Sequence, residues 1–363
     1  MFDNGTAMLA RTALLDQWNI DLRTTLMPII ILLLIYLLIG TCGNTIVIYI
    51  YKFRFREYNE DRYFIPVLAM VDLFASVVCP TGEIISYFNP VKYTNCVVCK
   101  FFQTMEHFAS GYSAILLTVV AINRYRAICR PLKPRFTIRT RRAMLLGTFV
   151  FVACLVIPSV VTNGIKMVDH TALNVTGSRC TTITVRGSST FPLAYNILLM
   201  TACVSNLVVL CVLYTLVIRA LFQQARNRTS QMLASVTVIS SSSACQRNES
   251  RQNHRNSITS SGQMSLDTLK LAANRLTVMF CIVTSVYVIC FIPTLIVMVL
   301  ISLDNSWLTK SQSQIAGLRF VRNMFMINNI VNPIIYGIFD KKIRDEIIKI
   351  VKGRIKCHFN QNT

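Results

Sequence analysis

Ionisable side chains stand inside the longest apolar stretches of this chain. Asp72 and Glu83 lie in one such stretch, Glu106 lies in the next, and Arg124 ends it. Charged groups are costly in hydrocarbon, so proteins keep them there for ion binding, ligand binding or conformational switching. Eleven positions separate Asp72 from Glu83. On a helix that spacing leaves an offset of only about 20°, so both carboxylates would point to the same side.

A second set of polar side chains follows one stripe of the next apolar stretch. Cys99, Glu106, Ser113 and Arg124 are separated by 7, 7 and 11 positions. One face of a helix would carry all four, because these spacings come close to whole turns. The spacing therefore predicts a polar track along the full length of this helix.

Four of the polar groups are expected to meet at mid-depth: Asp72, Ser113, Asn328 and Asn332. One carboxylate surrounded by neutral oxygens suits a small cation, and sodium is the candidate. The alternative is that these groups only hydrogen-bond to one another and hold the helices together. The residues alone leave both interpretations open. No other cofactor is predicted.

The elements that must position these residues are long apolar runs. The chain is 53% hydrophobic and only 15% charged, whereas soluble domains carry about 25% charged residues. A helix of about 20 apolar residues crosses the hydrocarbon core of a membrane. Runs of this length or more occur at 27–51, 64–88, 100–123, 143–162, 191–221, 276–301 and 315–339. The sequence therefore predicts an all-α membrane protein, a bundle of seven transmembrane helices.

The distribution of basic residues predicts how this bundle is oriented. The segments 51–63, 124–142, 219–275 and 340–363 hold 27 of the 37 Lys and Arg residues. All four would lie on one side of the membrane. The positive-inside rule puts that side in the cytoplasm and the N-terminus outside. The formal net charge of +21 then indicates contact with anionic membrane lipids and no nucleic-acid partner.

The remaining segments complete the predicted organisation. Residues 1–26 form an extracellular N-terminal tail, 27–345 form the membrane domain, and 346–363 form a cytoplasmic tail. The Ser-, Asn- and Gln-rich segment 222–270 is predicted to be a disordered third cytoplasmic loop that offers phosphorylation sites. Apolar residues in 340–357 follow a helical spacing, which predicts a short amphipathic helix on the inner leaflet after the seventh span.

The outer side carries candidate modification sites. Asn4 and Asn174 begin sequons and are predicted to be glycosylated. Alternation of β-branched residues around Cys180 predicts a short hairpin. Cys96, Cys99 and Cys180 are the cysteines expected outside, where disulfides persist. Three cysteines permit one bridge and leave one thiol over.

Several short motifs occur in a fixed order along the apolar runs. They are Gly43-Asn44, "LAMVD" (68–72), Arg124 placed 25 residues after Cys99, "RAICRPL" (126–132), "CFIP" (290–293) and "NPIIY" (332–336). With these motifs the chain resembles the rhodopsin-like (class A) G-protein-coupled receptors over roughly 27–345. The resemblance implies a multi-pass plasma-membrane receptor that activates a heterotrimeric G-protein. It also implies arrestin and receptor kinases as partners of the Ser-rich third loop.

The resemblance also assigns roles to individual residues. Arg124 would face the axis of the bundle, hold the resting state, and then meet the C-terminal helix of a G-protein. A disulfide would join Cys99 to Cys180 and leave Cys96 free. Cys357 is a candidate for lipid attachment. The residues expected to serve activation and G-protein coupling are Asn123, Arg124, Tyr125, Pro131, Leu132, Tyr214, Pro293, Pro333 and Tyr336.

The sequence departs from the family pattern around the same arginine. Asn123 stands where an acid usually precedes it, and Ala273 stands where helix six usually supplies a second acid. We expect the resting state to be loosened and ligand-independent signalling to follow, because charge-assisted bonds are roughly twice as strong as neutral ones. The alternative is that Asn123, Thr277 or a water molecule replaces the missing charges. These departures indicate a divergent member.

The outer residues indicate the class of ligand. Glu106 stands where amine receptors of the family place the acid that pairs with an ammonium group, yet helix five lacks paired serines and helix six lacks an aromatic cluster. Acids and arginines together near the mouth favour a peptide, most plausibly a neuropeptide. The predicted ligand-binding residues are Glu83, Glu106, Arg319, Arg322 and Phe291. An internal ion pair between Glu106 and Arg322 is the alternative role for that acid.

The sequence also bears on the alternatives to a peptide receptor. The sequence contains no Gly-x-Ser-x-Gly motif and no intramembrane His-Glu cluster, so no enzyme is predicted. A biogenic-amine or other small-molecule receptor is the alternative to a peptide receptor. An ion-conducting or transporting bundle is a more distant alternative, since it would be built from paired repeats. Ligand-triggered GTP exchange would distinguish a receptor from a bundle that carries net ion flux.

Overall fold

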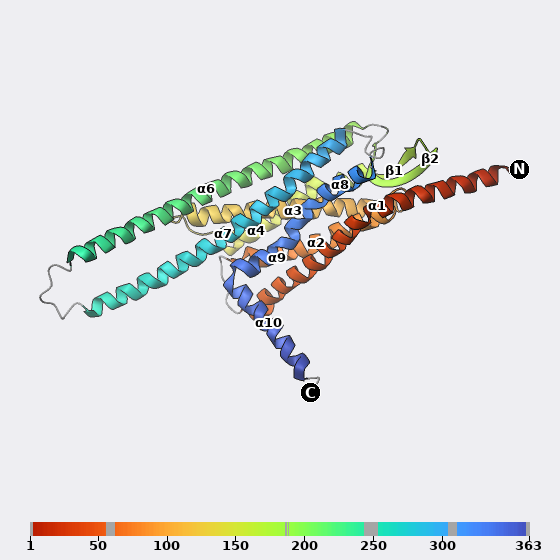
Figure 1. Ribbon diagram of the computed structural model, residues 1–363. Coiled ribbons are helices and arrows are strands. Elements are labelled where there is room, and N and C mark those ends of the chain that lie inside the picture. Colours follow the sequence, from red (N-terminus) through yellow and green to blue (C-terminus); the bar gives the residue numbers. More distant parts are fainter. Residues whose placement is uncertain are drawn as a thin grey trace.

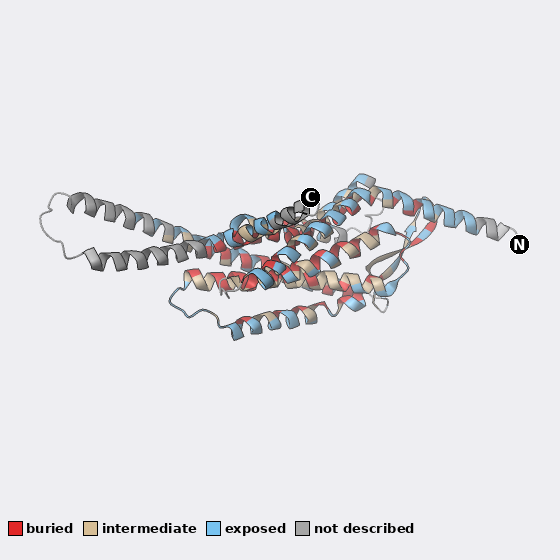
Figure 2. Ribbon diagram, turned by 90° about the horizontal axis from the view of Figure 1, so that it is seen from below, coloured by how far each residue is buried: buried red, intermediate tan, exposed pale blue. Residues whose placement is uncertain are grey.

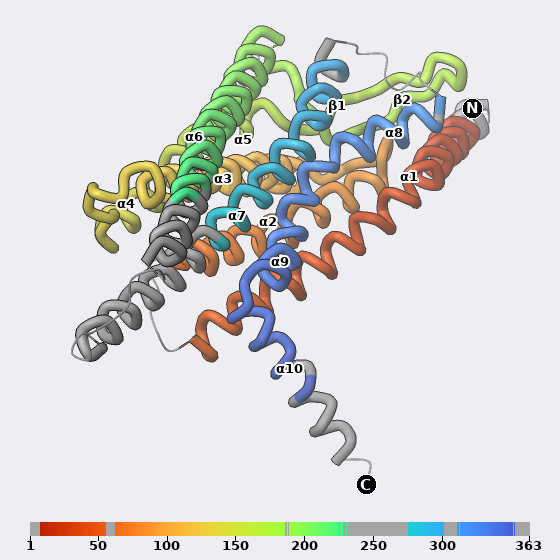
Figure 3. The backbone as a smooth tube through the Cα atoms, turned by 60° about the vertical axis from the view of Figure 1, so that its left-hand side comes forward, coloured from red at the N-terminus to blue at the C-terminus, as the bar shows by residue number. Residues whose placement is uncertain are grey.

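The computed structural model describes residues 3–55, 62–185, 187, 189–242, 253–303 and 311–360, and within these ranges it is almost entirely helical. Six helices are long and apolar enough to cross a membrane. They belong to α1 (Asp3–Tyr49), α2 (Phe64–Phe88), α3 (Cys96–Cys129), α4 (Ile138–Val156) with α5 (Ser159–Thr162), α6 (Thr190–Ser242) and α7 (Asn253–Leu303). These helices lie side by side, and α3 runs through the middle of the bundle (Figures 1 and 3).

The seventh predicted run is interrupted. It consists of α8 (Gln312–Arg322), a 3-10 turn (Asn323–Met326) and α9 (Ile327–Phe339). At the interruption, the side chain of Thr294 on α7 donates a hydrogen bond of 3.1 Å to the carbonyl of Val321. A side chain that binds a helix carbonyl is a recognised cause of such breaks. The described helices therefore include six spans of sufficient length and a broken seventh segment.

The exterior of this bundle differs from that of a soluble protein, because it is apolar although the core is apolar too. Large apolar side chains face outward, for example Leu38, Phe151 and Ile197, which are 64%, 56% and 57% exposed. Polar side chains such as Asp72 and Asn44 are fully buried. Figure 2 shows buried residues on the inner sides of the helices and exposed residues on their outer sides. An apolar exterior of this kind fits a membrane, where lipid covers it.

The N-terminal segment differs from the predicted tail. Residues 1–26 were expected to form a tail, whereas α1 is helical from Asp3 onward. Trp18, Leu22 and Leu26 are 5%, 8% and 3% exposed and lie four residues apart, so they form one stripe of the helix. Mixed polar neighbours mask this stripe in the sequence. Asn4 belongs to the first turn, where the structure describes no side chains.

The predicted hairpin is confirmed, and it lies at the end of the bundle that the sequence predicts to be outside. That end is called the outer end below, and the opposite one the inner end. Strands β1 (Asn163–His170) and β2 (Val175–Thr182) pair antiparallel, and Ile165 lies opposite Cys180. Asn174 lies in the exposed turn between them with a φ of 49°, a backbone conformation that asparagine tolerates. The predicted sequon is therefore accessible at this turn.

The inner end of the bundle also differs from its prediction in one segment. A disordered loop was expected over 222–270, but α6 continues to Ser242 and α7 begins at Asn253. No proline occurs between Pro192 and Pro293, so nothing in the sequence forces either helix to end sooner. Residues 243–252 lie outside the described part of the chain.

The helix expected after the seventh segment is present as α10 (Lys341–Asn360). Asp340 caps it by accepting a hydrogen bond of 3.0 Å from the backbone of Lys342. The same carboxylate lies 3.0 Å from Arg62 Nη2, which ties α10 to the segment before α2. Attachment of this helix to the inner leaflet stays a prediction, and Cys357 lies where the side chains of α10 are not described.

Candidate functional site

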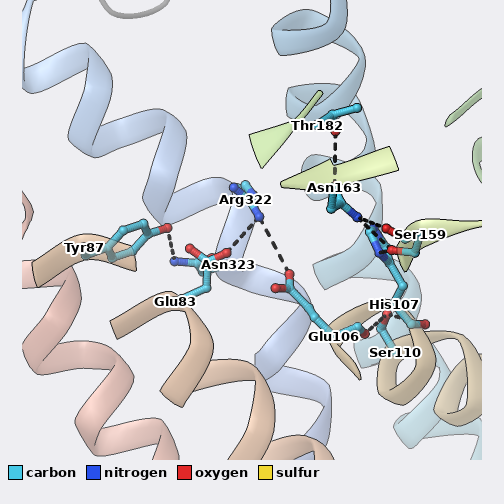
Figure 4. Close-up of polar contacts among 10 residues, drawn as sticks. All are labelled: Glu83, Tyr87, Glu106, His107, Ser110, Ser159, Asn163, Thr182, Arg322 and Asn323. Carbon is cyan, nitrogen blue, oxygen red and sulfur yellow. Dashed lines mark hydrogen bonds and ion pairs between the residues drawn. The ribbon is translucent and has the colours of Figure 1, made fainter. Parts of the chain in front are cut away.

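The outer end of the bundle is organised around Arg322, the last residue of α8. Its Nη2 donates a hydrogen bond of 2.8 Å to Glu83 Oε1 on α2. The same nitrogen lies 3.8 Å from Glu106 Oε1 on α3. The side chains of Glu83, Glu106 and Arg322 are 2%, 14% and 21% exposed. One guanidinium thus links two carboxylates from different helices (Figure 4).

This arrangement answers the question that the sequence left open about Glu106. The internal ion pair with Arg322 exists, but the shorter contact goes to Glu83. Formally the three groups carry one net negative charge. A pair at 2.8 Å in a site shielded from water interacts more strongly than one at 3.8 Å, because screening is weaker and the charges are closer. Glu106 is therefore the carboxylate more available to a ligand.

Aromatic and amide groups surround the cluster. The guanidinium of Arg319 lies over the ring of Tyr87, 5.4 Å from its centre. Asn323 Nδ2 donates a hydrogen bond of 3.1 Å to the hydroxyl of Tyr87. Arg319 is 6% exposed, so its cation is held within the protein. The predicted mouth residues Glu83, Glu106, Arg319 and Arg322 are thus brought together.

A cavity of about 240 Å³ opens beside this cluster, between α3, α4, α6, α7 and β2. Its charged end is formed by Glu106, Arg179 and Arg322. Phe291, the fifth predicted ligand residue, lines it from α7 and packs edge-on against Phe325, with ring centres 6.4 Å apart. The apolar wall is made by Ala114, Ile115, Val152, Leu155, Val156, Leu199, Met200, Leu295 and Met298. The cavity thus combines a charged entrance with an apolar interior.

Neutral polar groups form a second cluster on the far wall. His107 Nδ1 and Ser159 Oγ are 3.0 Å apart. Asn163 Nδ2 donates to Ser159 Oγ over 2.7 Å, and Thr182 Oγ1 donates to Asn163 Oδ1 over 3.5 Å (Figure 4). The sequence interpretation missed these residues, because a single histidine or asparagine in an apolar run gives no specific signal.

The hairpin is fixed above the cavity by covalent and hydrogen bonds. The predicted disulfide is confirmed, since Cys99 on α3 is joined to Cys180 on β2, and Cys96 is an exposed free thiol. Ser178 of β2 bonds the segment before α3 through Val91 O and Tyr93 N, at 2.8 and 3.0 Å. The residue beside the disulfide, Arg179, lines the cavity and was missed by the sequence interpretation.

The four polar residues expected at mid-depth do meet. Asn332 Nδ2 donates to Asp72 Oδ2 over 2.6 Å, and Ser113 Oγ donates to Asp72 Oδ1 over 3.4 Å. Asn328 Nδ2 lies 3.5 Å from Ser113 Oγ. All four are at most 3% exposed, and the buried Asn328 Oδ1 has no hydrogen-bond partner. Hydrogen bonds thus join a buried carboxylate to a hydroxyl, and the hydroxyl to an amide whose oxygen is unsatisfied.

The amide of Asn206 connects α6 to α3 below the cavity. Its Oδ1 accepts a hydrogen bond of 2.7 Å from Thr118, and its Nδ2 donates to the carbonyl of Ala114 over 3.3 Å. The structure shows that it joins two helices.

At the inner end, Arg124 is 1% exposed and its guanidinium lies 4.9 Å from the centre of the Phe280 ring on α7. Asn123 beside it is 8% exposed. The expected position of Arg124 in the interior is therefore found, and the sequence interpretation missed Phe280. The other residues assigned to activation lie at different depths. Tyr214, Tyr336 and Pro333 are buried, and Tyr125 is partly buried. Pro293 lies within α7, whereas Pro131 and Leu132 lie in the loop after α3.

Comparison with known proteins gives one family and several distant relatives. The pattern of the 7 transmembrane receptor (rhodopsin family) matches residues 43–336. Neuropeptide receptor 18 of Caenorhabditis elegans is 27% identical over 123 residues, which are 32% of this chain and 26% of that receptor. The RYamide receptor of Drosophila melanogaster is 30% identical over 129 residues, or 34% of this chain and 27% of that receptor.

A third relative is named for another function. Olfactory receptor 4N4C of Homo sapiens is 30% identical over 131 residues, which are 34% of this chain and 40% of that receptor. In each of these three relatives the matched part is less than half of the protein. The similarity thus indicates shared family and leaves the class of ligand to be argued from the site.

Proposed function

The chain belongs to the rhodopsin family of seven-transmembrane receptors, and we propose that it binds an extracellular peptide and activates a heterotrimeric G-protein. The observation that carries the proposal is the charged entrance, where Arg322 is held between Glu83 and Glu106 beneath a disulfide-anchored hairpin. A ligand with both cationic and anionic or amide groups can exchange contacts with such a cluster. Peptides offer these groups together.

The apolar interior of the cavity supports the same ligand class. Behind the charged entrance, its walls are mainly aliphatic and aromatic, so an apolar side chain gains free energy by leaving water there. A short peptide would place one apolar residue in the interior and its polar backbone against the hairpin. The relatives named as a neuropeptide receptor and an RYamide receptor add to this argument.

A biogenic amine is the second candidate, because Glu106 lines the cavity. An amine would have to compete with Arg322, whose Nη2 lies 3.8 Å from that carboxylate. It would then leave the apolar interior and Arg179 without matching groups. The geometry therefore favours the peptide.

The proposal includes a sodium ion at mid-depth. Asp72 accepts its hydrogen bonds from the neutral donors Ser113 and Asn332, so its negative charge is not balanced by these contacts. The unsatisfied oxygen of Asn328 adds a further donor atom for a cation. Hard cations prefer such oxygens. Bound sodium would supply the balancing positive charge and stabilise the arrangement of helices around it.

The remaining parts of the proposal concern location and partners. The protein is a multi-pass membrane protein, and we place it in the plasma membrane with its N-terminus outside, in accordance with the basic inner segments. Glycosylation at Asn174 fits its exposed turn. Receptor kinases are proposed to phosphorylate serines of the segment 222–270, and arrestin is proposed to bind that segment.

The test is a second-messenger screen of cells that express the full chain, against neuropeptides and biogenic amines. We expect a peptide to raise GTP exchange on a G-protein, with no net ion flux. A response restricted to amines would contradict the peptide assignment, and ion flux without GTP exchange would contradict the receptor assignment.

A variant sharpens the screen once an active peptide is found. Glu106→Gln should lower its affinity by tens of fold, because loss of one member of a desolvated charge pair costs about 2–5 kcal/mol of binding. The matched control is Gln103→Glu, which adds charge one helical turn away on the same cavity wall. An unchanged dose-response curve for Glu106→Gln would remove Glu106 from the ligand site.

A further inference from the structure

The far wall of the ligand cavity carries a neutral polar cluster that the proposed function leaves without a role. His107 and Asn163 line the cavity from α3 and β1. Ser159 of α5, which is fully buried, lies between them. Its Oγ is 3.0 Å from His107 Nδ1 and accepts a hydrogen bond of 2.7 Å from Asn163 Nδ2 (Figure 4). Three elements of the fold thus hold these side chains together.

The hydrogen bonds of this cluster determine where the imidazole carries its proton. The amide nitrogen of Asn163 can only donate, so Ser159 Oγ is the acceptor of that bond. The serine proton is then available to His107 Nδ1, the acceptor that lies at hydrogen-bond distance among the described residues. The Gln103 carbonyl also lies near the ring, but a bond to it from Nδ1 would leave the serine proton without this acceptor. A neutral imidazole that accepts at Nδ1 is protonated at Nε2.

The protonated nitrogen is available to a ligand. Among the residues that the structure describes, His107 Nε2 has no hydrogen-bond partner, and the side chain lines the cavity. It therefore presents an N–H donor. Asn163 Oδ1 supplies an acceptor on the same wall, since it receives one bond of 3.5 Å from Thr182 and a carbonyl oxygen can accept a second. The wall thus offers a donor and an acceptor that are both neutral.

We propose that this wall binds a carboxamide of the ligand. The amide oxygen accepts from His107 Nε2, and the amide N–H donates to Asn163 Oδ1. A carboxylate is better placed beside Arg322 at the charged entrance, and an ammonium group beside Glu106, which points about 100° away from its neighbour His107 on α3. Burial of either charge against a neutral wall would be costly. The inference rests on the proposed function only in taking this cavity as the ligand site.

The experiment uses the full-length protein in nanodiscs and three probes that share one cyclohexane ring. They are cyclohexanecarboxamide, cyclohexanecarboxylate and cyclohexylmethylamine, so the apolar part is constant and the polar group varies. Saturation-transfer NMR measures their dissociation constants without agonist or G-protein, and the result is therefore independent of receptor activation. We expect the carboxamide to bind more tightly than the carboxylate, and Glu106→Gln to weaken only the amine.

The decisive variant is His107→Phe, which keeps a ring on the wall and removes the donor. Carboxamide affinity should fall about five- to tenfold, as expected for the loss of one hydrogen bond, and amine affinity should not change. The matched control is Ser110→Ala. Ser110 lines the same cavity, but its hydroxyl donates to the Glu106 carbonyl over 2.7 Å, so all three affinities should stay the same. Equal losses of carboxamide and amine affinity in His107→Phe would indicate a change of shape and overturn the proposal.

A second measurement reports the proton directly and does not depend on the folding of His107→Phe. In protein labelled with ¹⁵N in histidine, NMR distinguishes a proton on Nε2 from one on Nδ1, and His107→Gln identifies the signal of His107. We expect an Nε2–H signal that shifts when the carboxamide binds. Ser159→Ala should move the proton toward Nδ1 and weaken carboxamide binding. A wild-type ring protonated at Nδ1, or carboxamide binding that leaves this signal in place, overturns the proposal.

Discussion

The two ends of the bundle hold particular arginines in different ways. At the outer end, Arg322 lies between the carboxylates of Glu83 and Glu106. At the inner end, Arg124 and Arg126 lie over the rings of Phe280 and Phe136. Arg322 is thus matched with opposite charge, whereas Arg124 and Arg126 each lie against an aromatic face. The inner end also holds an ion pair of its own, between Arg62 and Asp340.

This difference has consequences for how each end can move. A buried ion pair is costly to break, because the remaining charge is left without compensation. The contact of a cation with an aromatic ring contributes only about 0.5–2 kcal/mol. The contacts of Arg322 should therefore persist until a ligand replaces one of its carboxylates. The ring contact of Arg124 should be easier to exchange for a contact with another partner.

The largest expected effect comes from breaking the outer ion pair. Glu83→Gln should lower the free energy of unfolding by about 3–5 kcal/mol, because Arg322 would keep only the longer contact to Glu106. Glu106→Gln should cost clearly less, since the 2.8 Å pair with Glu83 remains. Thermal unfolding of purified protein in detergent measures the loss of stability in each variant. Equal losses would mean that the two carboxylates are equivalent partners.

A double variant tests whether the loss of stability in Glu83→Gln is caused by the charge of Arg322 that is left without its partner. Glu83→Gln/Arg322→Met removes both charges and leaves no unpaired cation. It should recover part of the stability that Glu83→Gln loses, and only part, because Glu106 loses its 3.8 Å contact with Arg322. If the double variant is as unstable as the sum of the two single variants, the pair is not energetically coupled, and the contrast between the two ends fails.

The next effect concerns the covalent bond that fixes the outer end. Cys99→Ser should reduce stability by about 2–4 kcal/mol, because the bridge closes a sequence separation of 81 residues. Surface expression should fall accordingly. Cys96→Ser is the matched control, as its thiol is exposed and free, and it should behave like wild type. Equal surface expression of the two variants would show that the hairpin is held by its hydrogen bonds alone.

Much of this architecture could be predicted from the sequence, and the reason is local spacing. The helical separations between Cys99, Glu106, Ser113 and Arg124 are set by the chain itself, so their shared stripe was predictable. The disulfide followed from family spacing, and the mid-depth cluster from the polar residues placed inside the apolar runs. The shorter partner of Arg322 could not be predicted, because Glu83 is 239 residues away along the chain and helix packing decides the contact.

Other features were hidden by composition. The polar residues of 1–26 conceal the buried stripe of Trp18, Leu22 and Leu26, so the segment was predicted to be a tail. Phe280 is one aromatic residue among many in an apolar run, and only its contact with Arg124 distinguishes it. Periodicity identifies the face of a helix but does not identify the residue opposite it.

A smaller effect is expected where the two ends are connected, at the mid-depth cluster. If sodium binds Asp72 and favours the resting arrangement, raising sodium should weaken agonist binding, with a coupling of about 1–3 kcal/mol. Asp72→Asn should abolish the dependence. Potassium at the same concentration is the control for ionic strength. Agonist affinity that responds equally to both salts would leave only the hydrogen-bonding role for these residues.

The smallest expected effect tests the inner end itself. Asn123 and Ala273 stand where the family usually supplies acids, so the ring of Phe280 is expected to contribute to the hold on Arg124. Phe280→Leu keeps an apolar side chain but removes the ring. It should raise ligand-independent signalling by about twofold to thirtyfold, because a cation–π contact of this kind is worth about 0.5–2 kcal/mol. Asn123→Asp adds a negative charge beside Arg124 and should lower ligand-independent signalling.

Phe280→Leu should raise basal signalling and Asn123→Asp should lower it. A general loss of stability could not produce these opposite changes. The measurement is basal GTP exchange at matched surface expression, with Arg124→Ala as the baseline for a receptor that cannot couple. If wild type already equals Arg124→Ala, the resting state is held by contacts other than the ring. If Phe280→Leu and Asn123→Asp shift the signal in the same direction, the aromatic face does not act as the restraint, and the inner end resembles the outer end after all.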